Sequence, residues 1–253
     1  MIPRYYLVAE SVHELQNPTS EEKILLLGRR LGLSSESRVL DVASGRGGPA
    51  LLLATTFGCA IEGIEIEPAF LDVAVEQAES NGLSELLSFR LANAANVELP
   101  AETYDAALCL GASFVYGDLA GTVARLAPAV KPGGYVAVGE PYWRRLPLPA
   151  EYEQRELLLT TLDGTVSIFE TEGLPVVSVL ASSDDEWDRY ETLHWQSVER
   201  WLVENPDDPE AEAIRARHEQ HKWNYLRFRR ELMGWAIFVG WKPAQAASSR
   251  RST

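Results

Sequence analysis

The stretch Val39-Leu-Asp-Val-Ala-Ser-Gly-Arg-Gly-Gly48 decides the fold, because an apolar strand pattern in it runs directly into a glycine-rich turn. Pro49 follows, at a position that suits the first turn of a helix. In an open parallel sheet, ligands bind beyond the carboxyl ends of the strands, and glycines there let the backbone approach a ligand closely. The stretch therefore predicts a ligand-binding strand–turn–helix unit. Its Gly45-x-Gly47-x-x-Ala50 spacing also matches a loose dinucleotide fingerprint, so the turn alone does not identify the ligand.

Strand-like and helix-like segments alternate around this unit over residues 1–145, which predicts a parallel sheet covered by helices. Residues 1–243 are expected to form a single α/β domain. Within it, residues 183–232 have helical periodicity and carry an aromatic stripe, so we expect a helical insertion that forms a lid or a substrate wall. The small, polar tail 244–253 is expected to be disordered. The expected strands are 38–42, 60–66, 86–91, 104–110, 135–139, 175–181 and 235–241.

The composition of the chain restricts its partners. Among 253 residues, 37 are acidic and 23 are basic, which gives a formal net charge of −14. A field of that sign repels polyphosphate, so nucleic acid is not an expected partner. No apolar run approaches the ~20 residues of a membrane-spanning helix, so no membrane partner is expected. Cys59 and Cys109 make neither a disulfide framework nor a zinc site, so we expect a reduced, cytoplasmic protein without a metal.

Polar groups stand at the ends of three predicted strands. Asp41 precedes the glycine turn, where a carboxylate would oppose a pyrophosphate but would attract a cationic ligand. Glu65 ends the second strand and can accept hydrogen bonds from both hydroxyls of a ribose. Asn93 follows the third strand, with an amide that can recognise the edge of an adenine. The turn Lys131-Pro-Gly-Gly134 leads into the fifth strand.

With these residues the chain resembles the class I S-adenosylmethionine-dependent methyltransferases. Asp41-x-Ala-x-Gly-x-Gly47 is similar to the first motif of that family, Glu65 to its ribose-binding acid, and Asn93 to its adenine-binding acid. Two residues depart from the family pattern: Ala43 replaces a usual glycine and Asn93 a usual aspartate, and an alanine is acceptable if that residue is extended.

The resemblance implies a Rossmann-like, seven-stranded, mostly parallel sheet in the order 3-2-1-4-5-7-6. It also implies S-adenosyl-L-methionine as the cofactor. The cofactor-binding residues that it implies are Asp41, Ala43, Ser44, Gly45, Gly47, Glu65, Ile66, Asn93, Ala94, Leu110 and Gly111.

Missing motifs narrow the acceptor of the methyl group. The fourth strand ends in Cys109-Leu-Gly-Ala-Ser-Phe114, without the signatures of DNA base methylation, and no metal set of the catechol type follows it. Together with the acidic surface, this favours a small molecule that accepts the methyl group on an N, O or C atom by direct displacement. The stretches Gly139-Glu-Pro-Tyr-Trp143 and Trp187-Asp-Arg-Tyr-Glu191 resemble bacterial methyltransferases related to the cyclopropane-synthase and ubiquinone-biosynthesis types.

Three residues are candidates for catalysis. Glu140, after the fifth strand, could orient the acceptor or remove a proton, and the alternative is a solvated strand-end acid. Tyr142 could wall the acceptor pocket or cap the sheet edge. His194 lies on the aromatic stripe, where a hydrogen-bonded core histidine is the common alternative. The second insertion helix is basic, and we expect a solvated face there, with a carboxylate-bearing acceptor at Arg227 or Arg229 as the alternative.

Two other functions fit parts of the pattern. The loose glycine fingerprint allows a nucleotide-dependent oxidoreductase, and the same fold allows a non-catalytic S-adenosylmethionine-binding protein. The aromatic stripe of the insertion would also suit a dimer interface, so the chain is expected to be a monomer or a homodimer.

Overall fold

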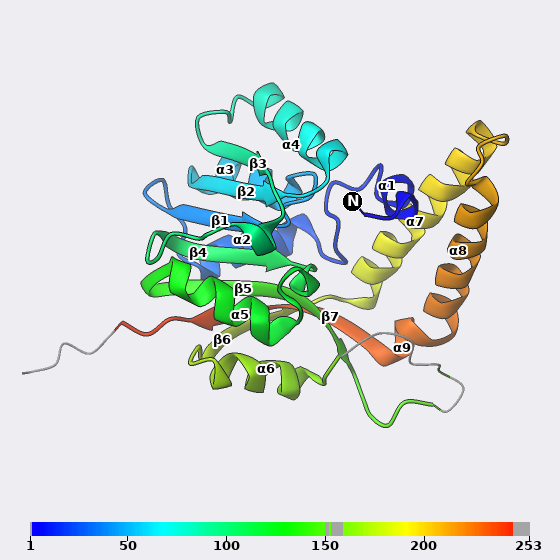
Figure 1. Ribbon diagram of the computed structural model, residues 1–253. Coiled ribbons are helices and arrows are strands. Elements are labelled where there is room, and N and C mark those ends of the chain that lie inside the picture. The colour runs from blue at the N-terminus through cyan, green and yellow to red at the C-terminus, as the bar shows by residue number, and fades with distance from the viewer. Residues whose placement is uncertain (1, 150–151, 153–158, 245–253) are drawn as a thin grey trace, which may run out of the picture.

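The computed structural model describes residues 2–149, 152 and 159–244, so almost all of the tail predicted to be disordered lies outside the described residues. Its centre is a seven-stranded sheet in the order β3-β2-β1-β4-β5-β7-β6, which confirms the predicted order (Figure 1). Only β7 runs antiparallel to its neighbours, β5 and β6. The strands are β1 (Arg38–Val42), β2 (Ala60–Glu65), β3 (Leu87–Leu91), β4 (Tyr104–Leu110), β5 (Val130–Trp143), β6 (Val176–Ala181) and β7 (Met233–Trp241).

Helices cover both faces of the sheet, and each face has its own apolar core. On one face α2 (Glu21–Arg30), α3 (Gly48–Phe57) and α4 (Pro68–Ser80) pack over alternate strand residues such as Val39. On the other face α5 (Leu119–Leu126) and α6 (Leu162–Thr171) pack over the residues between them, such as Leu40. This division follows from the alternation of side chains along a strand. Short 3₁₀ turns occur at η1 (Ala94–Asn96), η2 (Ser113–Tyr116) and η3 (Ala127–Ala129).

The predicted strand–turn–helix unit forms as expected. Strand β1 is buried except for its first residue, and Gly47 takes a left-handed conformation (φ 79°) at the start of α3. Pro49 occupies the first turn of the helix, and Gly58 ends it in a second left-handed conformation (φ 70°). The glycine turn therefore lies at the carboxyl end of the central strands.

Strand β5 is longer than the sequence predicts, and this changes where its residues point. It runs from Val130 to Trp143, and its last residues pair with the start of β7. Two glycines allow this pairing, because each leaves room for an aromatic ring of the other strand. A β-carbon on Gly139 would lie 2.4 Å from the Trp235 ring, and one on Gly234 would lie 2.3 Å from the Tyr142 ring. The residues 140–143 are thus strand residues with alternating directions.

The predicted insertion forms a pair of long helices that stands beside the carboxyl ends of the strands (Figure 1). It consists of α7 (Asp184–Glu204), α8 (Ala211–Asn224), a π-helical turn (Tyr225–Arg229) and α9 (Arg230–Leu232). The N-terminal helix α1 (Arg4–Ala9) packs against α7 and α8 and closes a small core of its own. No helix in the described part of the chain is long and apolar enough to cross a membrane. The buried residues of that small core are Tyr5, Val8, Ala9, Val198, Leu202, Ala211 and Ile214.

Candidate active site

A cavity of about 510 Å³ lies at the carboxyl ends of the central strands, and we call it the strand-end cavity. The structure brings together in its wall eight of the eleven residues that the sequence predicts for the cofactor. These are Asp41, Ala43, Ser44, Gly45, Glu65, Ile66, Leu110 and Gly111.

Two buried carboxylates dominate the electrostatics of the strand-end cavity. Asp41 is 2% exposed and Glu65 is 5% exposed. Burial, and the nearby charge of Glu65, raise the pKa of Asp41 to about 7. The Asp41 Oδ2 atom and the Ser44 hydroxyl are buried without a hydrogen-bond partner among the described residues. Such a site is poorly suited to an anionic ligand, and a ligand with a positive or hydrogen-bond-donating group would satisfy Asp41.

Glu65 is held in place by backbone amides. Its Oε2 atom accepts a hydrogen bond from the amide of Gly45, and its Oε1 atom accepts from the amides of Ile66 and Glu67, each at 2.8 Å. A carboxylate has about four lone-pair positions, so one remains for a ligand hydroxyl. The Glu65 carboxylate thus links the glycine turn to the end of β2 and keeps an acceptor at the cavity.

The glycine turn contains one conformation that the sequence analysis did not expect. Ala43 was acceptable there as an extended residue, but its φ is 55°, in the left-handed region that favours glycine. The glycine that is usual at this position in the family would adopt this conformation without strain. Gly45 (φ 56°) and Gly111 (φ 83°) adopt similar conformations in the wall of the cavity.

Asn93, Ala94 and Gly47 are predicted cofactor residues that do not line the strand-end cavity. The Asn93 side chain instead caps η1, because its Oδ1 atom accepts a hydrogen bond from the amide of Ala95 at 3.0 Å. Ala94 is buried in the core, and Gly47 packs against Ala74 of α4. Gly47 therefore contributes to the conformation of the glycine turn through its contact with α4, outside the wall of the strand-end cavity.

The N-terminal segment is a part of the wall that the sequence analysis missed. Gln16 and Asn17 lie against the glycine turns: the Gln16 side chain accepts from the amide of Arg46 at 2.6 Å, and Asn17 donates to the Leu110 carbonyl at 3.0 Å. A β-carbon on Gly45 would lie 2.2 Å from Gln16, and one on Gly111 would lie 2.0 Å from Asn17. No periodic pattern in the sequence marks this segment. The other lining residues that were missed are Ile2, Pro3, Tyr6, Glu10, Pro49, Phe70, Ala112, Phe114, Val115 and Tyr190.

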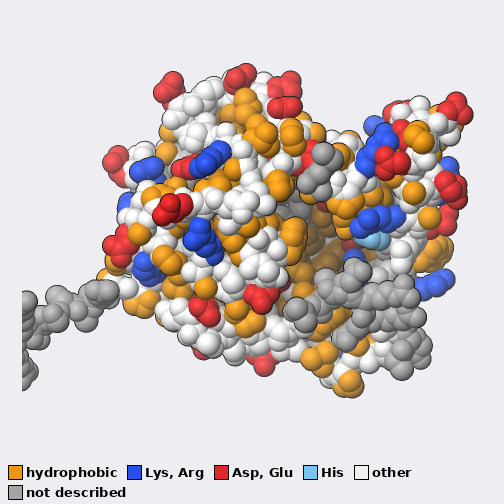
Figure 2. Space-filling view, viewed as in Figure 1, with side chains coloured by type: hydrophobic (Ala, Val, Ile, Leu, Met, Phe, Trp, Pro, Cys, Tyr) orange, Lys and Arg blue, Asp and Glu red, His pale blue; other side chains and the backbone are white. Residues whose placement is uncertain are grey.

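A second cavity, of about 1130 Å³, lies between the sheet and the insertion, and we call it the insertion cavity. Figure 2 shows this hollow between the body of the molecule and the two helices, with hydrophobic side chains around it. Tyr6, Gly111 and Tyr190 line both cavities, so the two adjoin each other. The other aromatic residues in the wall of the insertion cavity are Tyr5, Trp143, Tyr152, Trp187, Phe228 and Trp235.

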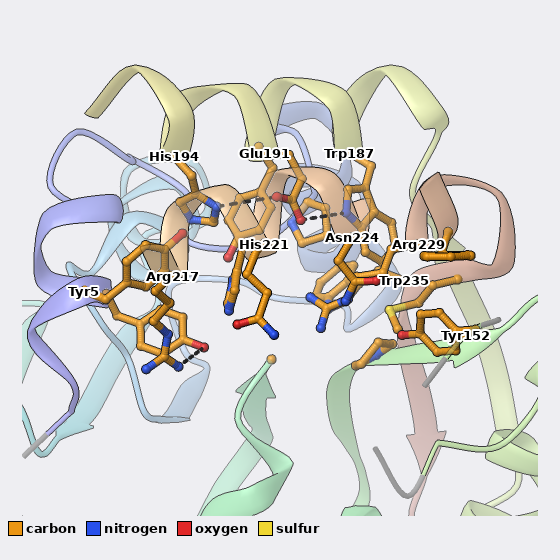
Figure 3. Close-up of a pocket in the computed structure, with 18 of the residues that line it drawn as sticks. Tyr5, Tyr152, Trp187, Glu191, His194, Arg217, His221, Asn224, Arg229 and Trp235 are labelled. Carbon is orange, nitrogen blue, oxygen red and sulfur yellow. Dashed lines mark hydrogen bonds and ion pairs between the residues drawn. The ribbon is translucent and has the colours of Figure 1, made fainter. Parts of the chain in front are cut away.

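Helix α7 contributes four polar or aromatic side chains to the wall of the insertion cavity, Tyr190 among them. Trp187, Glu191 and His194 follow one another at the spacing of one helix face (Figure 3). A capping box of Ser183 and Glu186 fixes the start of this helix. The predicted aromatic stripe is therefore a wall of the cavity as well as a packing surface.

His194 belongs to a buried hydrogen-bonded cluster where the two cavities meet. Its Nε2 atom lies 2.9 Å from Glu10 Oε1, which also accepts a hydrogen bond from the Tyr190 hydroxyl at 2.9 Å. The ring of His13 lies 4.5 Å from that of His194. Burial opposes the charged form of His194, but its hydrogen bond to Glu10 and the Glu191 carboxylate 4.0 Å from Nδ1 outweigh burial and raise its pKa to about 9.

The comparisons agree with this geometry. Residues 39–134 match a family model described as a methyltransferase domain. Protein YjhP of Escherichia coli (strain K12) is 37% identical over 243 residues, which cover 94% of this chain and 98% of the relative. The SAM-dependent methyltransferase from Geobacter sulfurreducens, solved in complex with S-adenosyl-L-homocysteine, is 34% identical, with a TM-score of 0.88 over 94% of this chain and 98% of that one. This chain belongs to the SAM-dependent methyltransferases.

A methyltransferase from Thiobacillus denitrificans, also solved with S-adenosyl-L-homocysteine, gives the same result. It is 35% identical, and its TM-score is 0.87 over 94% of this chain and 98% of that chain. The resemblance noted from the glycine turn and the strand-end acids is thereby confirmed for nearly the whole length of the methyltransferase.

Glu140 and Tyr142 are predicted catalytic residues of the methyltransferase that line neither of the two cavities. Because β5 extends to Trp143, its residues alternate: Pro141 and Trp143 face the insertion cavity, whereas Tyr142 packs on the opposite core. Burial raises the pKa of Glu140 to about 7, although a hydrogen bond from Ser113 opposes the shift. The predicted strand, 135–139, is shorter than β5, so this alternation does not follow from the sequence. Among the three catalytic candidates, only His194 lines a cavity.

Proposed function

We propose that this protein transfers the methyl group of S-adenosyl-L-methionine to an N, O or C atom of a small molecule. The strand-end cavity would hold the methyl donor and the insertion cavity the acceptor. The observation that carries the proposal is the buried Asp41 carboxylate, whose Oδ2 atom has no hydrogen-bond partner among the described residues, in the wall of a cavity that adjoins a larger aromatic one.

The residues of the strand-end cavity fit this donor. Asp41 is buried, lacks a partner among the described residues, and would gain one from the positive charges of the donor. The same carboxylate would repel the pyrophosphate of a dinucleotide, which disfavours a nucleotide-dependent oxidoreductase. Glu65 keeps one acceptor position for a ribose hydroxyl at the end of β2, and not the two positions that the sequence predicts.

When bound, the donor supplies a methyl group on a positively charged sulfur. A lone pair of the acceptor takes this methyl group, and the donor is left as a neutral thioether. The chain itself provides position and an environment without water. Gln16 and Asn17 cover the glycine turns, and the insertion covers the acceptor side. No covalent bond to the enzyme is needed for such a transfer.

His194 suits orientation of the acceptor better than removal of a proton. With a pKa raised to about 9, it already carries its proton at neutral pH, held between Glu10 and Glu191. A protonated imidazole donates hydrogen bonds and cannot accept a proton. For an acceptor that must lose a proton, Glu191 is the carboxylate in the wall of the insertion cavity.

Calorimetric titration with S-adenosylmethionine, S-adenosylhomocysteine and NAD tests the donor assignment. We expect the first two to bind and NAD not to bind. Because the donor favours the charged form of Asp41, affinity for S-adenosylmethionine should rise from pH 6 to pH 8 by up to about tenfold. Asp41→Asn should abolish that pH dependence, and Glu36→Gln, at an exposed acid, should keep it.

Binding of NAD in place of the two adenosyl compounds would refute the donor assignment. Transfer itself is tested by release of S-adenosylhomocysteine from a panel of small amines, phenols and carboxylic acids. A protein that binds the donor and releases no product with any of them would be the non-catalytic alternative.

A further inference from the structure

The charged residues that line the insertion cavity are predominantly cationic, although the whole protein is acidic. Among the described lining residues, Glu191 is the single carboxylate, whereas His194, Arg217 and Arg229 are basic. The chain as a whole carries a formal net charge of −14. The positive charge of this cavity is therefore opposite in sign to the net charge of the protein. Acidic residues are abundant in the chain, yet few of them line the cavity and neutralise its basic residues.

Arg217 is fixed in the cavity by aromatic rings. Its guanidinium lies 5.3 Å from the centre of the Tyr5 ring and 5.0 Å from that of the Tyr6 ring, and it donates to the Tyr6 hydroxyl at 3.4 Å (Figure 3). No carboxylate of the described residues forms an ion pair with it. Its charge is therefore held in position while most of its five N–H donors remain for a ligand.

Other arginines of the insertion form ion pairs with carboxylates. On the same insertion, Arg230 forms an ion pair with Asp188 at 2.8 Å, and Arg189 pairs with Asp185. Arg229 lines the cavity, and its Nε atom is buried without a partner among the described residues. His221 lies between the two cavity arginines on the chain, and burial together with their positive charges lowers its pKa to about 4. This wall of the cavity thus disfavours a further cation.

Much of the rest of the wall of the insertion cavity is apolar and aromatic, and this indicates which kind of molecule would carry an anionic group to Arg217. Trp143, Trp187 and Trp235, with Tyr152 and Phe228, offer broad apolar faces in the same cavity. Arg217 stands at the other end, next to Tyr6, which also lines the strand-end cavity. The two ends together suit a molecule with one charged oxygen group and a ring or chain body.

From this arrangement we infer that the acceptor carries an oxyanion, a carboxylate or a phosphate, on an apolar or aromatic body, and that Arg217 binds this anion. That the bound anion is the methyl acceptor rests on the proposed function. Binding of the anion to this site can be tested without methyl transfer. It places the anion near the junction of the two cavities and the apolar body along the tryptophans. Arg227 does not take part, because it is exposed and stacks on Trp223 outside the cavity.

Calorimetric titration with matched probes tests the inference: 3-phenylpropionate, phenyl phosphate and the neutral 3-phenylpropionamide, each added to the protein with and without S-adenosylhomocysteine. The anionic probes should bind at least about tenfold more tightly than the amide, as expected for hydrogen bonds to a charged group. Comparing the first two probes distinguishes a carboxylate from a phosphate. Arg217→Gln should remove the preference for the anion and leave the amide unchanged, and Arg217→Lys should keep part of it.

Arg227→Gln, on the same helical segment but outside the cavity, is the matched control and should behave as the wild type. Unchanged affinity for S-adenosylhomocysteine in Arg217→Gln would show that the fold is intact. Equal binding of the amide by the wild type, persistence of the preference for the anion in Arg217→Gln, or no binding of any probe would overturn the inference. Failure of S-adenosylhomocysteine to bind would instead count against the proposed function, since the acid and amide can still be compared without it.

Discussion

Ala43 has an unfavourable backbone conformation in the wall of the strand-end cavity. Its backbone is left-handed (φ 55°), a conformation that costs an L-residue about 1–2 kcal/mol, yet it lies in the wall of the strand-end cavity. We expect Ala43→Gly to remove this strain from the folded state. This gain should at least offset the greater conformational freedom of glycine in the unfolded chain, so the free energy of unfolding should stay equal or rise by up to about 1 kcal/mol. Thermal or urea unfolding measures this.

The matched control for Ala43→Gly is Ala213→Gly, in an exposed position of α8. A glycine in an ordinary helical position lowers stability by about 1 kcal/mol relative to alanine. Equal losses in the two variants would show that Ala43 is not strained.

Glu140, which is partly buried, and Glu186, which is buried, should respond in opposite ways when their charge is removed by substitution with glutamine. The pKa of Glu140 is raised to about 7, so the wild type loses stability as the pH rises from about 4.5 to about 7. Glu140→Gln removes this loss, and the variant should be more stable than the wild type at pH 8 and similar to it at pH 4. Because Glu140 lines neither cavity, donor affinity should not change.

Glu186 is the counterpart with a depressed pKa. Burial opposes its charge, but hydrogen bonds from Lys23, Ser20 and Ser183 outweigh burial and lower its pKa to about 2. Its contribution is fully present above pH 4.5 and is lost as the pH falls towards 2. Glu186→Gln should therefore cost about 2 kcal/mol at pH 7. Unfolding curves at pH 4 and pH 8 compare both variants, and a stabilised Glu186→Gln or a destabilised Glu140→Gln at pH 8 would contradict the two assignments.

At the scale of elements, the N-terminal segment is the part of the site that joins the sheet to the insertion. Residues of α1 pack on α7 and α8, while Gln16 and Asn17 contact the glycine turns. Binding of S-adenosylhomocysteine should therefore slow amide hydrogen exchange in residues 2–17. Mass spectrometry of the exchanged protein measures this, with α6 as the remote control. Unchanged exchange in residues 2–17 at saturating ligand would show that this segment does not close the cavity.

The order of the sheet could be predicted, and so could eight lining residues of the strand-end cavity, because both depend on local patterns. Asp41, Glu65 and the glycine turn follow directly from strands that are themselves apolar runs. The N-terminal segment could not be predicted, because its contacts with the turns join residues far apart in sequence. Glu140 and Tyr142 were misplaced for a similar reason: the length of β5 depends on its pairing with β7, about a hundred residues later.

The whole molecule combines a strongly acidic surface with a donor that is a cation. S-adenosylmethionine carries one more positive charge than S-adenosylhomocysteine, so the field of a protein with a net charge of −14 should attract the first and not the second. Raising the salt from 20 to 500 mM should slow association of S-adenosylmethionine on the order of a few-fold. Stopped-flow fluorescence measures this, and an equal effect on S-adenosylhomocysteine would exclude steering by net charge.

Ile2 and Pro3 stand in the wall of the strand-end cavity, which has a practical consequence for recombinant work. A purification tag joined ahead of them would start beside this wall. A tag at the carboxyl end would follow β7, whose last residues lie at the opposite edge of the sheet from the cavity (Figure 1). Ligand affinities and turnover should accordingly be compared between amino-terminal and carboxyl-terminal fusions before either is taken as native.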